Sequence, residues 1–204
     1  MLGPAPLPAA RRPRPIGPPP DAATLREAAL DYLTRYAATE AGLKRVLERR
    51  VDRWSRLARV EADDLDAVAR QASEARRVVR DVVIRLAAAG AVNDATFAES
   101  KARTLIRAGR SRLAVAAYLA AKGVAAEVAR SVLPESTAGE LAAALTLARR
   151  RRIGPFRAGP VLDQAGRSRE LAILARAGFP QSIASEALDM PTDEAEALVH
   201  ALRR

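Results

Sequence analysis

Arginines at helical spacing are the residues in this sequence whose chemistry is clearest. Arg45, Arg49 and Arg53 recur at every fourth position, so they would form one basic row along a helix. Like charges on successive turns repel one another, and an acidic partner opposite the row would relieve that repulsion. If DNA phosphates are the partner, binding will weaken steeply as salt is added. The candidate binding face comprises Arg45, Arg49, Arg53, Arg103, Arg107, Arg110, Arg112, Arg149, Arg150, Arg151, Arg152, Arg167 and Arg169.

The residue combinations that carry out catalysis are missing from the sequence. It has no paired carboxylates, no serine–histidine pair, no glycine-rich phosphate loop and no cysteine, and its one histidine is His200. Asp63, Asp64 and Asp66 loosely resemble an acidic calcium loop, but the turn glycine and the closing glutamate of such a loop are absent. We interpret these aspartates as a loop that ends in a helix cap. We therefore expect a protein that binds without catalysis, and we expect neither a cofactor nor a metal.

Composition favours a helical protein with a polyanionic partner. The 204 residues carry a net charge of +10, which suits nucleic acid, an acidic protein surface or anionic lipid. The same charge is also typical of a solvated basic surface, or of a GC-rich genome that encodes many arginines and alanines. Hydrophobic residues make up 49% of the chain and aromatic residues 3%. A core of this kind is built through close helix-on-helix contact.

The N-terminal 20 residues differ from the rest of the chain. They contain eight of the thirteen prolines, together with Arg11, Arg12 and Arg14. This composition predicts a disordered basic tail over residues 1–20 and is unlike the hydrophobic core of a signal peptide. No apolar run in the chain approaches the roughly 20 residues that span a bilayer. We expect a cytoplasmic monomer.

The most regular stretch of the chain runs from Asn93 to Val124. Asn93 is a helix-start signal, Gly109 stops that helix, Ser111 caps the next and Gly123 closes it. Helical periodicity predicts further helices, and no stretch has the alternation of a strand. In the first of them, Tyr36 is expected to belong to the buried stripe. These helices cover about 21–38, 40–59, 67–89, 125–133, 140–153, 163–177, 181–188 and 191–203.

Parts of this central unit recur before and after it. Thr39 corresponds to Ser111 at an offset of 72 residues, and Gly123 corresponds to Gly178 at a further 55. Three-helix units that cannot bury a face alone stack on one another into an elongated array. We predict an all-α fold with a tail over 1–20, a first three-helix repeat over 21–89 whose second helix is extended and basic, a second repeat over 90–134, and a third repeat plus a C-terminal helix over 135–204.

The residues of the repeats resemble the RecX family of recombination regulators over about positions 22–190. The resemblance is carried by Ala29-x2-Tyr32-Leu33-x-Arg35-x3-Thr39-x3-Leu43-x3-Leu47, Gly90-x2-Asn93-Asp94-x2-Phe97-Ala98, Val115-x3-Leu119-x3-Gly123-Val124 and Gly178-Phe179. The family's first repeat usually has serine and then glutamate-leucine where this chain has Thr39 and Gly42-Leu43. The span 51–66 is longer here than in the minimal family pattern.

The resemblance implies a curved array of three-helix repeats that binds along the RecA–single-stranded-DNA filament. It also implies a position in the filament groove across neighbouring RecA subunits, and inhibition of strand exchange, ATP hydrolysis and stimulated LexA cleavage. Such a regulator would act in homologous recombination, DNA repair and the SOS response.

Other functions remain open on the residues alone. The chain could be a helical nucleic-acid-binding protein that acts without RecA, an enzyme such as a nuclease, or a protein that lies on a membrane surface. The missing acidic metal cluster argues against the nuclease, and the commitment of the apolar stripes to the core argues against the membrane. On their helical phase, we expect the aromatic side chains to be core residues and not base-stacking platforms; these are Tyr32, Trp54, Phe97, Tyr118 and Phe179.

Overall fold

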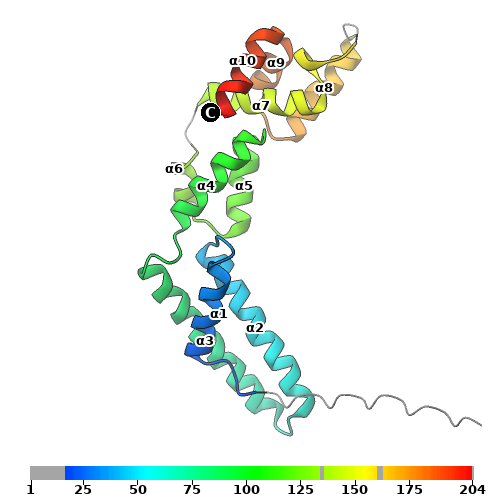
Figure 1. Cartoon of the computed structure of the whole chain (residues 1–204). Helices are drawn as coiled ribbons and strands as arrows, with labels where there is room; N and C mark the ends of the chain where they lie inside the picture. Colours follow the sequence, from blue (N-terminus) through cyan, green and yellow to red (C-terminus); the bar gives the residue numbers. More distant parts are fainter. Residues whose placement is uncertain (1–16, 134–135, 160–162, 204) are drawn as a thin grey trace, which may run out of the picture.

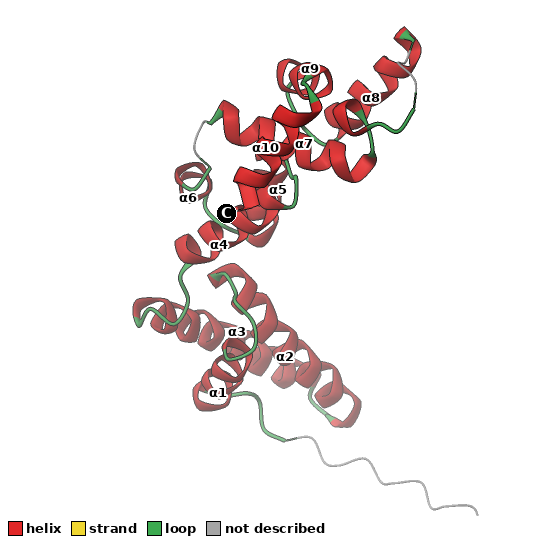
Figure 2. Cartoon of the chain, turned by 45° about the horizontal axis from the view of Figure 1, so that its top comes forward, coloured by secondary structure: helices red, strands yellow, loops and turns green. Residues whose placement is uncertain are grey.

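The computed structural model describes residues 17–133, 136–159 and 163–203, and within these ranges it contains helices and no strand. The predicted disordered tail over residues 1–20 lies outside the described residues up to position 16, and residues 17–20 are described as non-helical chain. Figures 1 and 2 show the helices strung along one axis with a bend, and the all-α, elongated and curved array is confirmed. The helices are α1 (Ala22–Leu33), α2 (Glu40–Glu61), α3 (Leu65–Ala88), α4 (Asp94–Arg107), α5 (Arg112–Lys122), α6 (Ala126–Ser131), α7 (Thr137–Arg151), α8 (Gln164–Arg176), α9 (Gln181–Asp189) and α10 (Thr192–Arg203), with a 3-10 turn η1 (Gly154–Phe156).

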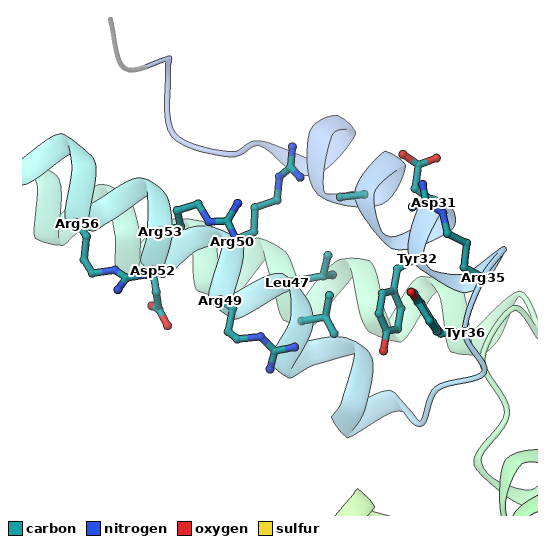
Figure 3. A pocket seen from close by; sticks show the side chains of 12 residues that line it. Asp31, Tyr32, Arg35, Tyr36, Leu47, Arg49, Arg50, Asp52, Arg53 and Arg56 are labelled. Atoms are coloured by element: carbon teal, nitrogen blue, oxygen red, sulfur yellow. The ribbon is translucent and has the colours of Figure 1, made fainter. Parts of the chain in front are cut away.

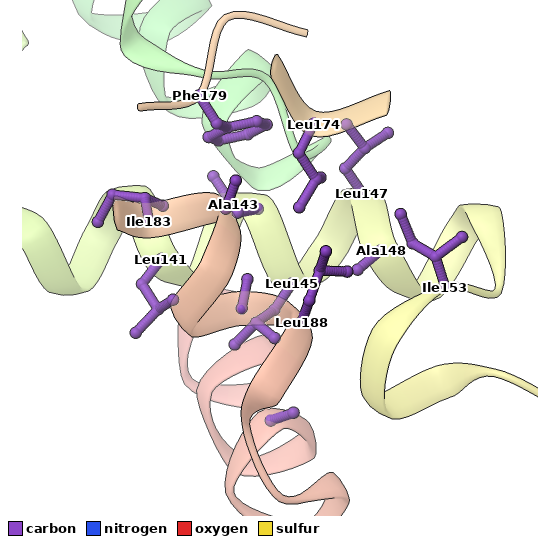
Figure 4. Packing of buried hydrophobic residues seen from close by; sticks show 14 of the residues in the cluster. Leu141, Ala143, Leu145, Leu147, Ala148, Ile153, Leu174, Phe179, Ile183 and Leu188 are labelled. Carbon is purple, nitrogen blue, oxygen red and sulfur yellow. The ribbon is translucent and has the colours of Figure 1, made fainter. Parts of the chain in front are cut away.

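The buried side chains form three separate clusters that follow one another along the chain. The first joins α1, α2 and α3 around Leu43 and Val79, and the second joins α4, α5 and α6 around Leu119. The third joins α7, α8, α9 and α10 around Leu145 and Leu174, as Figure 4 shows for most of its members. Because each cluster draws on neighbouring helices, the molecule is extended, as expected of stacked repeats.

Side chains at the helix starts satisfy backbone amides that have no partner inside the helix. Asn93 and Ser111 cap α4 and α5, as predicted. Asp64 accepts a hydrogen bond from the amide of Ala67 at 2.8 Å, so the interpretation of the acidic loop as a helix cap is confirmed. The same device begins four more helices, with the caps Asp21, Thr39, Ser136 and Asp163.

Two of these caps also join neighbouring repeats. The hydroxyl of Thr39 donates a hydrogen bond of 2.7 Å to the carbonyl oxygen of Lys122, at the end of α5. The hydroxyl of Ser111 donates a bond of the same length to the carbonyl oxygen of Ala177, at the end of α8. Both side chains are buried. Residues that correspond at the offset of 72 therefore make the same contact with the following repeat.

Glycines complete these two junctions. Gly123 and Gly178 both have φ of +88°, in the left-handed region that favours glycine. A Cβ atom on Gly123 would lie 2.4 Å from the Cβ of Ala41, and one on Gly178 would lie 2.8 Å from the hydroxyl of Ser111. Glycine is required at both places by the backbone conformation and by the closeness of the neighbouring repeat.

The first repeat departs from the prediction at the end of α1. The helix ends at Leu33, five residues earlier than expected, and the amide of Thr34 closes it on the carbonyl of Leu30. Tyr36 therefore lies in the connection to α2 and is 57% exposed, so its expected burial was wrong. Among the described helices, none combines the length and apolarity needed to cross a membrane.

Candidate polyanion-binding face

A groove of about 720 Å³ between α1 and α2 is lined by five exposed arginines (Figure 3). Arg49 and Arg53 of the predicted basic row line it. Sequence reasoning missed other members of the site, although for Arg50 and Arg56 the helical phase relative to Arg49 and Arg53 was a usable signal. The additional lining residues include Arg35, Arg50, Arg56, Tyr32 and Tyr36.

The groove keeps a net positive charge, because its five arginines outnumber the two aspartates that line it, Asp31 and Asp52. Asp52 lies in the groove wall, but its carboxylate accepts a hydrogen bond of 2.7 Å from Arg76 of α3. Glu48, one turn away, pairs with Lys44 at 3.8 Å. Among the described carboxylates, none forms an ion pair with the five groove arginines. Their repulsion would be relieved by a bound polyanion.

Arg45 lies apart from the other two members of the predicted row. Its guanidinium donates a hydrogen bond of 3.1 Å to the carbonyl of Lys122, beside the hydroxyl bond of Thr39. Arg45 therefore contributes to the junction between the first and second repeats. The sequence showed that Arg45 faces outward from α2, but not that the next repeat would meet it there.

A second arginine cluster lies where the second and third repeats meet, around a shallow cavity of about 380 Å³. Arg110 from the α4–α5 turn, Arg150 and Arg151 from the end of α7, and Arg176 from the end of α8 line it. Arg150 also donates a hydrogen bond of 3.3 Å to the carbonyl of Ala108. The structure thus brings together three of the predicted residues and adds Arg176, which the sequence showed only as an outward-facing arginine.

Four more predicted arginines are exposed but lie outside these two clusters. Arg103 and Arg107 line a shallow depression on α4 that also contains Glu99. Arg149 and Arg152 are exposed at the end of α7, where Arg152 closes the helix with a positive φ of 56°.

Arg112 is partly enclosed at the second junction. Its backbone amide donates to both carboxylate oxygens of Glu140, at 3.1 and 3.0 Å, and its guanidinium reaches the carbonyl of Leu133 at 3.5 Å. Burial raises the pKa of Glu140 above its ordinary value, although the hydrogen bond from Arg112 and the charge of that arginine act in the opposite direction. Arg112 is thus part of the internal structure of the array.

Arg167 and Arg169 of α8 also make contacts within the molecule. Both Nη atoms of Arg167 donate to the carboxylate of Asp189 on α9, with 2.6 Å between Nη2 and Oδ2. This pairing raises the pKa of Arg167. Arg169 donates to the carbonyl of Ala165 in its own helix at 3.3 Å. These two arginines are not gathered with either cluster.

An ion pair that sequence reasoning missed stabilises the third repeat. The buried carboxylate of Glu170 accepts hydrogen bonds from Arg157, at 3.0 Å for its Nε atom, and from the amide of Gly154, at 3.1 Å. Hydrogen bonding to Glu170 raises the pKa of Arg157. The pair holds the turn η1 against α8. No signal in the sequence connected these positions, which lie in a loop and a helix.

The arrangement as a whole provides positive charge and an elongated shape. Within the described ranges there is no group of three or more His, Cys, Asp or Glu side chains that could hold a metal ion. What the site can do chemically is bind phosphates or carboxylates with arginine, the side chain suited to two-pronged recognition of both.

Comparison with known proteins identifies relatives of the chain. Residues 93–133 match the family model described as RecX, second three-helix domain, which covers α4, α5 and α6. The chain is 40% identical over 181 residues to the regulatory protein RecX of Myxococcus xanthus (strain DK1622), covering 88% of this chain and 89% of that protein. It is 37% identical over 106 residues to the regulatory protein RecX of Agrobacterium fabrum (strain C58 / ATCC 33970), covering 52% of this chain and 56% of that protein. This protein belongs to the RecX family.

Proposed function

We propose that this protein binds the RecA filament assembled on single-stranded DNA and inhibits the recombinase, ATPase and coprotease activities of RecA. It would do so as a cytoplasmic monomer in homologous recombination, DNA repair and the SOS response. The protein would act by binding alone, in keeping with relatives that are named regulatory proteins.

The observation that carries the proposal is the presence of two arginine clusters in different repeats of an elongated array. An extended molecule can follow the groove of a helical filament and contact more than one subunit. The clusters supply charge for DNA phosphates or for acidic residues of the filament, and attachment at several points strengthens binding beyond that of either point alone.

The first test is cosedimentation of the purified protein with RecA filaments formed on single-stranded DNA with a non-hydrolysable ATP analogue. The same DNA without RecA is the reference, and both are followed across a salt series, with ATPase rates measured in parallel with ATP. We expect preferential capture by the filament, a steep loss of capture with salt and a falling ATPase rate. Equal capture by bare DNA and an unchanged ATPase rate would contradict the proposal.

Charge reversal tests the second cluster. The double variant Arg110→Glu/Arg151→Glu should weaken capture by at least about tenfold at physiological salt, because it replaces two cations with anions. The matched control is Arg80→Glu/Arg85→Glu on α3, which changes the net charge equally at exposed positions outside both clusters. If the two variants lose capture equally, overall charge is responsible and the cluster is not a contact site.

A nucleic-acid-binding protein that acts without RecA is the second candidate function. The tyrosines beside the arginines of the α1–α2 groove favour it, because an aromatic ring can stack on a base of DNA that carries no RecA. It would replace the first proposal if free DNA bound as tightly as the filament.

A further inference from the structure

The α1–α2 groove combines charge with aromatic surface, which the second cluster lacks. Tyr36 is 57% exposed, and its ring centroid lies 5.0 Å from that of Tyr32 at an interplanar angle of 38°. Tyr32 packs partly on the first core, whereas Tyr36 lies beyond the helix end and contributes no buried surface of comparable size. Figure 3 shows the two rings beside Leu47 in the same groove as the arginines.

The groove is matched to a polymer of phosphates. Arg49, Arg53 and Arg56 lie on one helix, and a rise of 1.5 Å per residue spreads them over roughly 10 Å along its axis. This spacing is better matched to successive phosphates of a chain than to a single phosphate group. The absence of a described carboxylate partner leaves these arginines available to such a chain.

The apolar floor of the groove indicates which class of polyanion fits it. Beside the tyrosines it has apolar atoms of Ala28, Val46 and Leu47, against which a flat ring can pack. A purely acidic peptide such as polyglutamate would satisfy the arginines and leave the exposed ring of Tyr36 without a flat partner. A duplex would bring phosphates, but its base faces are stacked inside. Only an unpaired nucleotide chain offers phosphates and free base faces together.

The protein's own tail is not a suitable occupant. The described chain begins at Gly17, whose carbonyl accepts a hydrogen bond of 3.0 Å from the indole nitrogen of Trp54 on α2. The residues that precede it in the sequence include Arg11, Arg12 and Arg14, which carry the same sign of charge as the groove. Charge complementarity therefore favours an external polyanion, and the basic tail would add to its attraction.

We infer that the α1–α2 groove is a binding site for single-stranded nucleic acid, with phosphates on Arg49, Arg53 and Arg56 and a base stacked on Tyr36. This deepens the second candidate function, on which it rests, by naming the residues of the site and its selection of unpaired bases. Stacking on an aromatic side chain tolerates any base, so the site prefers single strands and has little sequence preference.

The test uses the full chain without RecA and fluorescently labelled oligothymidylate, with binding followed by anisotropy. An abasic oligonucleotide of equal length, with the same phosphates and no bases, is the paired probe. We expect at least about fivefold tighter binding of oligothymidylate than of the abasic strand, the lower end of the range for one stacked base. Equal affinity for the two strands would overturn the inference.

Variants of Tyr36 localise the effect. Tyr36→Leu should remove the preference for the strand with bases and leave abasic binding unchanged, while Tyr36→Phe should retain the preference because it keeps the ring. Because Tyr36 is exposed, the fold is not at risk, and circular dichroism checks it. A Tyr36→Leu protein that still prefers the strand with bases would show that the ring is not the platform.

Two competitors and the RecA assay complete the design. A hairpin duplex and a polyglutamate peptide of equal charge should each displace oligothymidylate less effectively than unlabelled single strand; equal displacement by either would overturn the inference. RecA ATPase is measured with the same variants. Unchanged inhibition of RecA by a Tyr36→Leu protein that has lost the preference for the strand with bases would count against a role of Tyr36 in filament binding and leave the groove standing, so the two proposals fail separately.

Discussion

The two junctions between repeats share their bonds but differ in burial. In the first, the opening amide of α2, from Glu40, donates to the carboxylate of Asp94 at 2.8 Å. In the second, the corresponding amide of α5, from Arg112, donates to the carboxylate of Glu140. Asp94 is half-buried, whereas Glu140 is 8% exposed.

This difference shows that the same set of contacts can hold a carboxylate at two different degrees of burial. A carboxylate near water keeps most of its solvation, whereas a buried one loses solvation and resists ionisation. Hydroxyl, amide, carboxylate and glycine occur in the same order at both junctions. Packing around the second junction buries Glu140 and raises the pKa of its carboxyl group above the ordinary value.

Glycine replacement should have the largest effect and should separate the two junctions. Gly123→Ala forces a left-handed alanine, which costs about 1–2 kcal/mol, and pushes its methyl into Ala41, at a further cost of roughly 1–3 kcal/mol. Gly178→Ala should lose somewhat less, because its methyl meets the hydroxyl of Ser111 at the longer separation of 2.8 Å. Chemical denaturation measures both.

The control for this series is Gly90→Ala, which has a φ of +73° and nothing within 4 Å of the added Cβ. It should show the cost of the backbone conformation alone. If Gly123→Ala were no worse than Gly90→Ala, the close contact at the first junction would not constrain the array.

Removing the junction hydroxyls should have the next largest effect. Ser111→Ala and Thr39→Val each lose a helix cap and a buried hydrogen bond to the next repeat, and we expect about 1–3 kcal/mol of destabilisation for each. Hydrogen exchange should show faster opening at the end of α8 in the first variant and at the end of α5 in the second. Ser136→Ala, which removes a cap without an inter-repeat bond, should leave both regions protected.

Protonation of Glu140 should have the smallest effect on stability, and it tests the difference in burial between the two junctions directly. The pKa of Glu140 is raised by burial above its ordinary 4.5. Its protonation therefore favours the folded state, and this contribution is complete below pH 4.5 and is lost as the pH rises through the folded-state pKa. For one proton the slope cannot exceed about 1.4 kcal/mol per pH unit.

Urea denaturation across pH 4–7 checks this expectation against Glu140→Gln. Relative to that variant, the parent protein should lose stability as the pH rises through this window. Parallel curves for the two proteins would mean that burial does not shift this carboxyl group.

Local signals predicted most helix boundaries. Asn93, Gly109 and Ser111 act within a few residues of themselves, so their roles could be inferred without the rest of the fold. The end of α1 was misplaced because no strong breaker lies between Leu33 and Thr39. The helix stops there, and α2 then begins against the end of α5, where Thr39 donates a hydrogen bond to Lys122, more than 80 positions away.

The arginine site was less predictable than the helices. Helical phase showed that Arg45, Arg112 and Arg167 point away from their own cores, and the sequence could show no more than that. Their contacts are with groups from other repeats or other helices: the carbonyls of Lys122 and Leu133 and the carboxylate of Asp189. An outward direction does not reveal what lies there.

By itself, the sequence determined the helical character, the caps, the repeat and the basic surface of this protein, because periodicity, capping and charge act through neighbouring residues. The tertiary structure alone decided which arginines join repeats and which line a groove. It also placed Tyr36 in the α1–α2 groove and buried Glu140. These outcomes depend on which surfaces meet when the repeats stack, and that is set by contacts between residues far apart in the chain.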